Sequence, residues 1–181
     1  MKQLFTYSIL AFALILGSCG NNKNISKTEE NSTSEKKTIQ KEELVIDNSK
    51  IEWYSMEEGI QLARKYDKLI FVDVYTDWCG WCKRMDATTF VDANVITAMN
   101  EKYIAIKFDA EQKDSLEFFG TTYSFKENGR RGYHELAAVL LDGRLSYPSF
   151  VVLNKNGNRV KKLIGYQKSQ QLITQLKTMQ Q

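Results

Sequence analysis

The 181-residue sequence is poor in the residues that hold metals or mark nucleic-acid binding. It contains a single histidine, His134, and three cysteines, whereas a structural zinc site needs about four nitrogen or sulfur ligands. Zinc binding is therefore a weak alternative, and we expect no metal and no cofactor. We expect His134 to be a surface or packing residue rather than a catalyst. The formal net charge of +3 is small, which gives no case for a nucleic-acid partner.

The sequence also lacks a long apolar run near its start. Lys2 precedes an apolar run over residues 9–16, which is too short to span a bilayer as a mature helix. The run ends in Leu16-Gly17-Ser18-Cys19, which resembles the lipobox of bacterial lipoproteins, where the signal is cut before an acylated cysteine. We therefore expect a lipoprotein signal peptide over residues 1–18 and lipidation at Cys19. An ordinary secretory signal is the alternative, and under both interpretations the protein is exported.

Residues 19–48 are expected to be the lipidated cysteine and a flexible polar tether. Asn, Lys, Ser, Thr and Glu dominate this stretch, so it buries too little apolar surface to offset its ordering entropy. The tether would hold a single domain, residues 49–181, on the periplasmic side of a bacterial membrane. Gly20 is not the aspartate that retains many lipoproteins in the inner membrane, which slightly favours the outer membrane.

The rest of the chain alternates between helical and strand patterns, which predicts an α/β domain with a mixed central sheet. Ser55 and Glu58 have capping-box spacing. The expected helices cover residues 55–67, 79–87, 92–99, 111–119 and 133–141 and a final stretch capped by Ser169. The expected strands cover residues 69–75, 103–108, 149–153 and 159–164, and residues 120–132 are expected to be a loop.

Cys79 and Cys82, in Trp78-Cys79-Gly80-Trp81-Cys82-Lys83, are interpreted as a redox dithiol. Their disulfide would close a very small loop and therefore constrain the unfolded chain little, so it is a poor structural crosslink. A helix beginning at Cys79 lowers the pKa of that thiol, because the free amides of the first turn favour the anion. Cys82, one turn later and more buried, could attack a mixed disulfide on Cys79.

Two carboxylates are candidates for tuning these thiols. Asp73 lies within an otherwise apolar strand, where a carboxylate is costly to bury unless it has a partner or takes up a proton. We interpret Asp73 as a proton acceptor for Cys82; an inert, wet edge position is the alternative. Asp86, one turn beyond Cys82, either faces that thiol or is plain helix surface. Gly80 has no side chain, so the backbone of a bound chain can approach closely. Trp78 and Trp81 offer apolar contact to that chain.

These residues resemble the thioredoxin superfamily, and the resemblance covers residues 50–181. Asp73 stands six residues before Cys79, Pro148 (the only proline) opens a strand, and Gly165 precedes the last helix. The chain is similar to exported thioredoxin-like proteins and to the C-terminal periplasmic domain of the disulfide reductase DsbD. That similarity rests on Asp77-Trp78-Cys79, Cys82-Lys83, Thr89-Phe90 and Val95.

The resemblance implies a thioredoxin-like fold with helices on both faces of the sheet, and a thiol-disulfide oxidoreductase activity. It implies Cys79 as nucleophile, Cys82 as resolving cysteine and redox partner of Cys79, and Asp73 with Asp86 as acids that tune them. It also implies a cis Tyr147–Pro148 bond flanking the substrate groove. The expected partners are exported proteins that bear disulfides and a membrane electron donor.

Two features depart from thioredoxin. Trp81 occupies the position of a proline, so an oxidase or isomerase is an alternative to the expected protein-disulfide reductase. The stretch around residues 112–131 is an insertion, which is either a partner-recognition loop or a tolerated surface insertion. A lipoprotein that keeps the fold and binds a partner without turnover is the remaining alternative.

Overall fold

The computed structural model describes residue 44 and residues 46–179. The expected signal peptide, the lipidated Cys19 and most of the tether lie outside the described residues. Leu44 packs against the buried residues of the domain, and the Asn100 amide donates to the Asp47 carbonyl. Contacts with the domain therefore begin before residue 49. None of the helices in the described part of the chain is long and apolar enough to cross a bilayer.

The elements alternate as the sequence predicts for an α/β domain. The helices are α1 (Met56–Tyr66), α2 (Gly80–Thr88), α3 (Ala93–Lys102), α4 (Glu135–Leu140) and α5 (Ser169–Thr178). The strands of the main sheet are β1 (Trp53–Tyr54), β2 (Leu69–Tyr75), β3 (Tyr103–Asp109), β8 (Ser149–Leu153) and β9 (Arg159–Ile164). Four further strands are β4 (Leu116–Phe118), β5 (Thr121–Tyr123), β6 (Phe125–Lys126) and β7 (Tyr133–His134).

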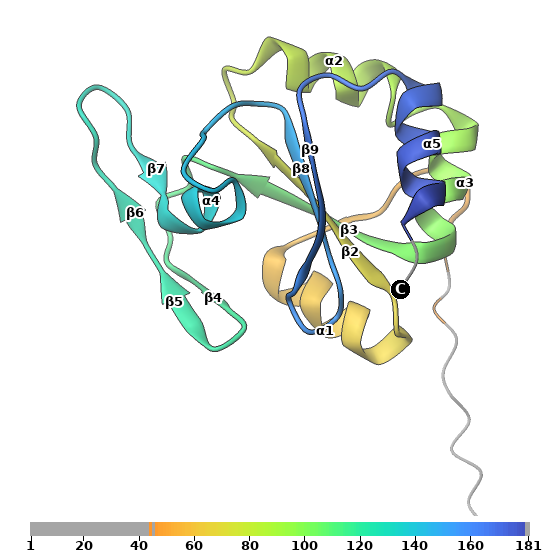
Figure 1. Cartoon of the computed structure of the whole chain (residues 1–181), viewed down its shortest axis with the longest axis horizontal. Coiled ribbons are helices and arrows are strands. Elements are labelled where there is room, and N and C mark those ends of the chain that lie inside the picture. Colours follow the sequence, from red (N-terminus) through yellow and green to blue (C-terminus); the bar gives the residue numbers. More distant parts are fainter. Residues whose placement is uncertain (1–43, 45, 180–181) are drawn as a thin grey trace, which may run out of the picture. The chain divides into compact units, whose positions relative to one another are not determined.

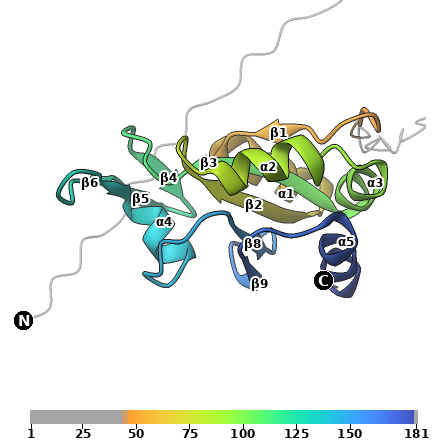
Figure 2. The ribbon, with the colours of Figure 1, turned by 90° about the horizontal axis from the view of Figure 1, so that it is seen from above.

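The five-stranded sheet is mixed, as predicted. Its strand order is β1-β3-β2-β8-β9, in which β1, β3 and β2 run parallel and β8 and β9 are antiparallel to their neighbours (Figures 1 and 2). The central strand β2 is the apolar run over Leu69–Tyr75, and its residues are buried up to Val74. A strand that is covered on both faces needs apolar side chains on both, which explains why this run does not alternate.

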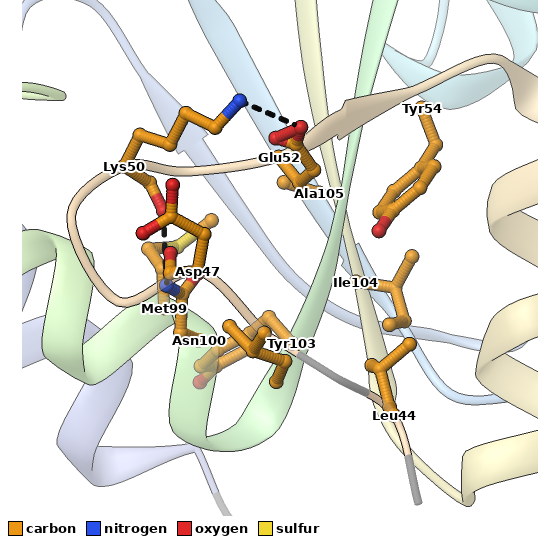
Figure 3. Close-up of a pocket in the computed structure, with 11 residues that line it drawn as sticks. Leu44, Asp47, Lys50, Glu52, Tyr54, Met99, Asn100, Tyr103, Ile104 and Ala105 are labelled. Carbon is orange, nitrogen blue, oxygen red and sulfur yellow. Dashed lines mark hydrogen bonds and ion pairs between the residues drawn. The ribbon is translucent and has the colours of Figure 1, made fainter.

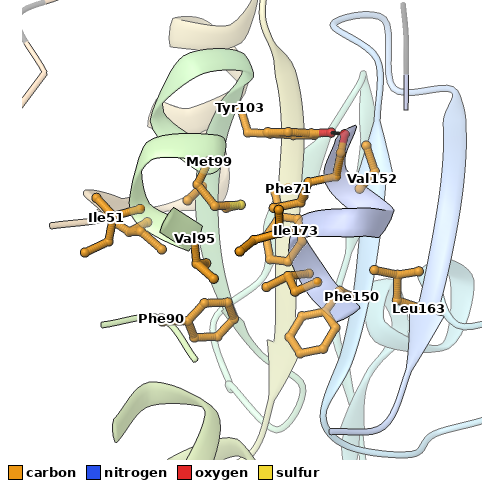
Figure 4. Close-up of a cluster of buried hydrophobic side chains, with 14 of the residues drawn as sticks. Ile51, Phe71, Phe90, Val95, Met99, Tyr103, Phe150, Val152, Leu163 and Ile173 are labelled. Atoms are coloured by element: carbon orange, nitrogen blue, oxygen red, sulfur yellow. Dashed lines mark hydrogen bonds between the residues drawn. The ribbon is translucent and has the colours of Figure 1, made fainter. Parts of the chain in front are cut away.

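Helices cover both faces of the sheet (Figure 2). Successive side chains of β2 point to opposite faces, so that Phe71 joins one core cluster and Val72 the other. The Phe71 cluster includes residues of α2, α3 and α5 and a stack of Phe71 on Phe150 with ring centroids 5.4 Å apart (Figure 4). The Val72 cluster includes residues of α1 and α4. Asp73 shares the face of Phe71, which is also the face of α2.

Two predicted helix starts are confirmed by their side-chain caps. The Ser55 hydroxyl accepts from the Glu58 amide and the Glu58 carboxylate accepts from the Ser55 amide, which is the predicted capping box. Asp92 caps α3 through the Asn94 and Val95 amides. The prediction for the last helix is wrong by one residue, because Lys168 is the N-cap and Ser169 already lies inside α5.

The predictions of a helix over residues 111–119 and a loop over residues 120–132 are wrong. Residues 112–134, called the arm below, form two hairpins, β4–β5 and β6–β7, that lie beside α4 (Figures 1 and 2). Phe119 and Gly120 connect β4 to β5, with φ angles of 48° and 84°. Two positive φ values are typical of a tight hairpin turn, but phenylalanine rarely adopts one, so residue types alone do not predict a turn here.

Tertiary contacts hold Phe119 in this turn. The Arg64 guanidinium lies 4.9 Å from the centre of its ring. A Cβ added to Gly157, in the turn between β8 and β9, would lie only 2.7 Å from the same ring. The ring therefore packs against two segments that are distant in sequence. The predicted helix over residues 133–141 is also shorter than expected, because Tyr133 and His134 pair with β6 and α4 begins at Glu135.

Candidate redox site

Cys79 lies where the chain turns from β2 into α2. Its amide donates to the Thr76 carbonyl at 3.1 Å, and Cys79 itself is the N-cap of α2 rather than its first residue. The Cys82 amide donates to Cys79 Sγ, with a nitrogen–sulfur distance of 3.1 Å. An amide hydrogen bond and the positive end of the helix dipole both favour a thiolate on Cys79 once the pair is reduced.

The structure holds Cys79 and Cys82 as a disulfide, with Cα atoms 5.3 Å apart. Cys79 is 4% exposed and Cys82 is 2% exposed, so the two residues are almost equally buried. A partner can therefore reach the Cys79 sulfur only by fitting closely against the surface around it. A Cβ at Gly80 would meet nothing within 4 Å, so the domain's own packing does not require glycine there.

Asp73 is buried rather than exposed to solvent, which rules out the alternative of an inert, solvated position at the edge of the sheet. Its residue is 1% exposed, and Oδ1 has no hydrogen-bond partner. Burial raises the pKa of Asp73 to about 6, against the opposing effect of Lys107, whose ammonium lies 2.7 Å from Oδ2. Asp73 thus exchanges a proton near neutral pH, which is the range in which a thiol must lose one.

Lys107 is the functional candidate that the sequence analysis missed. In the parallel register of β2 and β3, Lys107 lies directly opposite Asp73. Burial acts to lower its pKa, but Asp73 and Asp86 more than offset this, so that the pKa of Lys107 is raised. The signal was present in the sequence: each of two apolar strands carries one interior charge, and the charges have opposite signs. Only the strand register could pair them.

The surroundings of Lys107 hold its ammonium in place. Nζ lies 5.0 Å from the ring centres of Trp53 and Tyr75 and 5.7 Å from that of Phe90. It also binds the Asp86 carboxylate at 2.5 Å. The negative faces of the rings and two carboxylates therefore stabilise the cation in a site that is largely shielded from water.

Asp86 faces Lys107, and its side chain is 46% exposed. It is therefore neither plain helix surface nor a buried acid like Asp73. Its contact with the site runs through Lys107, which bridges the two carboxylates. Asp86 also contributes to the raised pKa of Asp73, because two like charges near one another resist ionisation.

The Tyr147–Pro148 peptide bond is cis, as the resemblance implied. Pro148 precedes β8, and its carbonyl accepts a hydrogen bond from the Gly165 amide at 2.8 Å. The Tyr147 ring stands edge-on to the Trp78 ring, with centroids 6.0 Å apart. The segment before β8 and the turn before Cys79 therefore meet at one place on the surface.

Two exposed tryptophans, Trp78 and Trp81, flank Cys79. Trp78 is 52% exposed and Trp81 is 55% exposed, which leaves both rings available to a partner. The Trp78 indole N–H donates to the Glu111 carboxylate at 3.0 Å. Trp81 lies against Tyr166, with ring centroids 5.4 Å apart. Together with Tyr147 these rings form an apolar rim around the dithiol.

Two other features lie apart from this site. A cavity of about 230 Å³ opens at the start of β3 (Figure 3). The dithiol instead follows the far end of β2, which runs parallel to β3. The lining of the cavity, which includes Tyr103 and Asn100, contains no residue of the redox site. His134 is fully buried at the base of the arm and stands edge-on to Phe108, so it is a packing residue, as expected.

Comparison with known proteins places these features in a family. The model of the family Thioredox_DsbH, described as "Protein of unknown function, DUF255", matches residues 40–133. The disulfide interchange protein DsbD of Colwellia psychrerythraea is 34% identical over 62 residues, which cover 34% of this chain and 10% of that protein. An uncharacterised protein of Caenorhabditis elegans is 28% identical over 87 residues, covering 48% of this chain and 12% of its own length. The chain thus spans about a tenth of these relatives.

Solved structures show the same fold. A proposed disulphide-isomerase from Bacteroides thetaiotaomicron is 26% identical, with a TM-score of 0.52 over 73% of this chain and 94% of the other. A thioredoxin from Thermus thermophilus also gives a TM-score of 0.52 at 18% identity, covering 71% and 85% of the two chains. The predicted thioredoxin fold is therefore confirmed.

Proposed function

The chain belongs to the thioredoxin-like family Thioredox_DsbH, and from that membership we propose that it is an exported thiol-disulfide oxidoreductase that mainly reduces disulfides of other exported proteins. The observation that carries the proposal is the position of Cys79 as N-cap of α2, with the Cys82 amide on its sulfur. The buried acid Asp73 lies on the face of the sheet that α2 covers. These are the groups that a dithiol reductase needs: a stabilised thiolate, a second thiol one turn away and a proton acceptor.

The reaction exchanges one disulfide for another. The Cys79 thiolate attacks a sulfur of the substrate disulfide; a new sulfur–sulfur bond forms, the substrate bond breaks, and the first substrate thiolate leaves and takes a proton. Cys82 then loses its proton and attacks Cys79, which releases the second substrate thiol. Two electrons pass from the Cys79–Cys82 dithiol to the substrate. A dithiol donor protein restores the reduced pair.

Asp73 takes the proton of Cys82 in the second step. Its Oδ1 has no other partner, and its pKa of about 6 leaves it mostly ionised at pH 7. Lys107 holds Oδ2 and thus orients the carboxylate. Lys107 is therefore a positioning residue for the proton transfer.

The substrate lies as an extended segment beside Pro148. The backbone next to a cis proline can pair with such a segment in the manner of an added strand. Trp78, Trp81 and Tyr147 then contact its side chains, and the open space at Gly80 admits its backbone.

Trapping of mixed disulfides tests the proposal. In a full-length Cys82→Ser variant the first step still occurs, but nothing resolves the product, so partners should accumulate on Cys79. The Cys79→Ser variant is the matched control, because it keeps one thiol but lacks the nucleophile. If Cys82→Ser traps no more protein than Cys79→Ser, and the unaltered protein reduces no disulfide, the proposed activity is wrong.

The direction of electron flow has its own test, since Trp81 replaces the proline of thioredoxin between the cysteines. A reduction potential near about −270 mV, as in thioredoxin, supports the reductase, whereas a value near about −120 mV, as in DsbA, supports an oxidase. The potential is measured by equilibrating the full chain with glutathione or dithiothreitol buffers.

Export and membrane attachment rest on the sequence alone, because residues 1–18 and Cys19 lie outside the described residues. The protein is a lipoprotein of the periplasmic side of a bacterial membrane, with the outer membrane slightly favoured. The Cys19→Ser variant should lose its lipid and appear in the soluble fraction, while mass spectrometry of the unaltered protein should find an acylated N-terminal Cys19. An unmodified N-terminus elsewhere would show an ordinary secretory signal.

A further inference from the structure

The rim around the dithiol carries two arginines, and each guanidinium lies over one of the exposed tryptophans. The Arg131 guanidinium lies 4.5 Å from the centre of the Trp78 ring, and the Arg84 guanidinium lies 5.6 Å from that of Trp81. Given the proposed function, we propose that Arg131 is a specificity-determining residue of this groove, which selects disulfides flanked by an acidic side chain. The arm thus becomes part of the substrate site.

Arg131 is held in position by Trp78 and by a long ion pair with Glu111, and it keeps N–H donors for a further acceptor. It contacts the face of Trp78, and its nearest carboxylate oxygen, Glu111 Oε1, lies 3.9 Å from NH1. That separation is longer than a hydrogen bond, and the same oxygen already accepts from the Trp78 indole. The planar guanidinium therefore keeps N–H donors in the geometry that suits a carboxylate, and the side chain is 57% exposed.

The contact also reaches the groove itself. Trp78 directly precedes the nucleophile Cys79, and Tyr147, which stands edge-on to Trp78, directly precedes cis-Pro148. Arg131 therefore flanks the place where a residue next to the attacked cysteine would lie. Stacking on Trp78 fixes the guanidinium there, which reduces the entropy lost when a substrate carboxylate binds.

The rim also has acidic neighbours, which oppose this preference. Glu111 accepts from the Trp78 indole, the charges of Glu111 and Asp109 both act on Tyr147, and Asp77 is exposed in the turn before Cys79. On the other side of the dithiol, Arg84 lies over both Trp81 and Tyr166 and adds a second positive charge. A flanking carboxylate can thus meet a guanidinium on either side of the cysteines, and Arg131 is the one that the arm contributes.

Three matched peptide disulfides test the inference. Each is a symmetrical dimer of a short single-cysteine peptide with Glu, Gln or Lys beside the cysteine, so that either sulfur has the same neighbour. The reduced full chain is mixed with each dimer, and release of the peptide thiol is followed over a single turnover. We expect the Glu dimer to react roughly 3-fold faster than the Gln dimer and about 5- to 10-fold faster than the Lys dimer at low salt.

The Arg131→Glu variant should reverse this order, and Arg131→Gln should reduce the preference for the Glu dimer to the part that Arg84 contributes. Arg130→Glu is the matched control, since it makes the same charge change at the adjacent exposed position and should keep the order of the unaltered protein. Equal rates for all three dimers overturn the inference but leave the reductase intact. An equal change in the order of the rates in Arg130→Glu and Arg131→Glu also overturns the inference. The effect would then come from the charge alone and not from the position of Arg131 over Trp78. If no dimer is reduced, the reductase and the inference both fail.

Discussion

The candidate redox site has two groups of charged side chains, one buried and one exposed. Asp73 and Lys107 lie between the sheet and α2, where the Asp73 side chain is only 2% exposed. Arg131 and Glu111 lie on the rim, with side chains 57% and 27% exposed. In the first pair the ammonium lies 2.7 Å from the carboxylate, whereas in the second the guanidinium lies 3.9 Å away.

The difference in burial predicts different tasks for the two groups. Burial raises the cost of charge, so the Asp73 carboxyl has a pKa of about 6 and suits proton transfer. The exposed pair is screened by water and salt, so it contributes little to stability and remains available to a partner. We therefore expect the buried pair to control the chemistry of the thiols and the exposed pair to control which substrate reaches them.

The largest expected effect is that of Asp73→Asn. The pKa of Asp73 is about 6 in the folded protein and 3.8 for an ordinary aspartate, so the fold loses stability from this group as the pH rises from about 4 through 6. The substituted amide stays neutral at every pH, and we expect the variant to be about 1–3 kcal/mol more stable than the unaltered protein at pH 7. The gain should vanish near pH 4. Denaturant unfolding at both pH values measures it.

The same variant should resolve mixed disulfides at least roughly 10-fold more slowly at pH 7, because the proton acceptor is gone. Release of a peptide from the Cys79 mixed disulfide, followed against pH, measures this step. The unaltered protein should show a rise in rate through about pH 6, and Asp73→Asn should not. A variant that is more stable yet resolves at the normal rate would show that Asp73 is merely a buried acid.

The next effect is that of Lys107→Gln, which removes the cation from the buried pair. Without the ammonium, the pKa of Asp73 should rise above about 6, so the rise in resolving rate should move to higher pH. Asp86→Asn is the matched control: it removes a half-exposed charge that raises the pKa of Asp73, so the profile should shift slightly to lower pH. Equal profiles in both variants would contradict the role given to Lys107.

Salt should separate the two groups directly. At about 0.5 M NaCl the screening length falls to only a few Å, so the roughly 3-fold preference for the Glu dimer should disappear. The pH dependence of the resolving step should stay, because the buried pair is shielded from ions. Single-turnover rates in low and high salt measure both properties. A salt-insensitive substrate preference would indicate apolar rather than charged recognition on the rim.

The smallest expected effect is that of Trp78→Phe, which keeps a smaller ring for Arg131 of the arm but removes the indole donor to Glu111, the residue that precedes the arm. Loss of one exposed hydrogen bond should cost less than about 1 kcal/mol and loosen the arm rather than the core. Amide hydrogen exchange should therefore quicken in β4–β7 and stay unchanged in β2 and β8. Trp81→Phe is the control, since Trp81 contacts Tyr166 and Arg84 rather than the arm. Equal amide exchange rates in both variants would show that Trp78 does not stabilise the arm.

Elements whose stability depends on neighbours within one turn or one strand were predictable from the sequence. The capping box of Ser55 and Glu58 and the apolar run Leu69–Tyr75 are local patterns, and the structure contains both. The dithiol at the start of α2 follows from the same reasoning, because Cys79 and Cys82 belong to a single turn. For such elements, residues that are close in sequence supply all the interacting groups.

Only the tertiary structure decided which distant groups meet. The Lys107 ammonium reaches Asp73 because β2 and β3 pair in one particular parallel register. The turn at Phe119 exists because Gly157 leaves space for the ring. Arg131 reaches Trp78 because the stretch predicted as a loop contains most of the hairpin β6–β7. Strand register, close packing and contacts between distant segments depend on the free energy of the whole fold. They therefore cannot be predicted from a local sequence pattern.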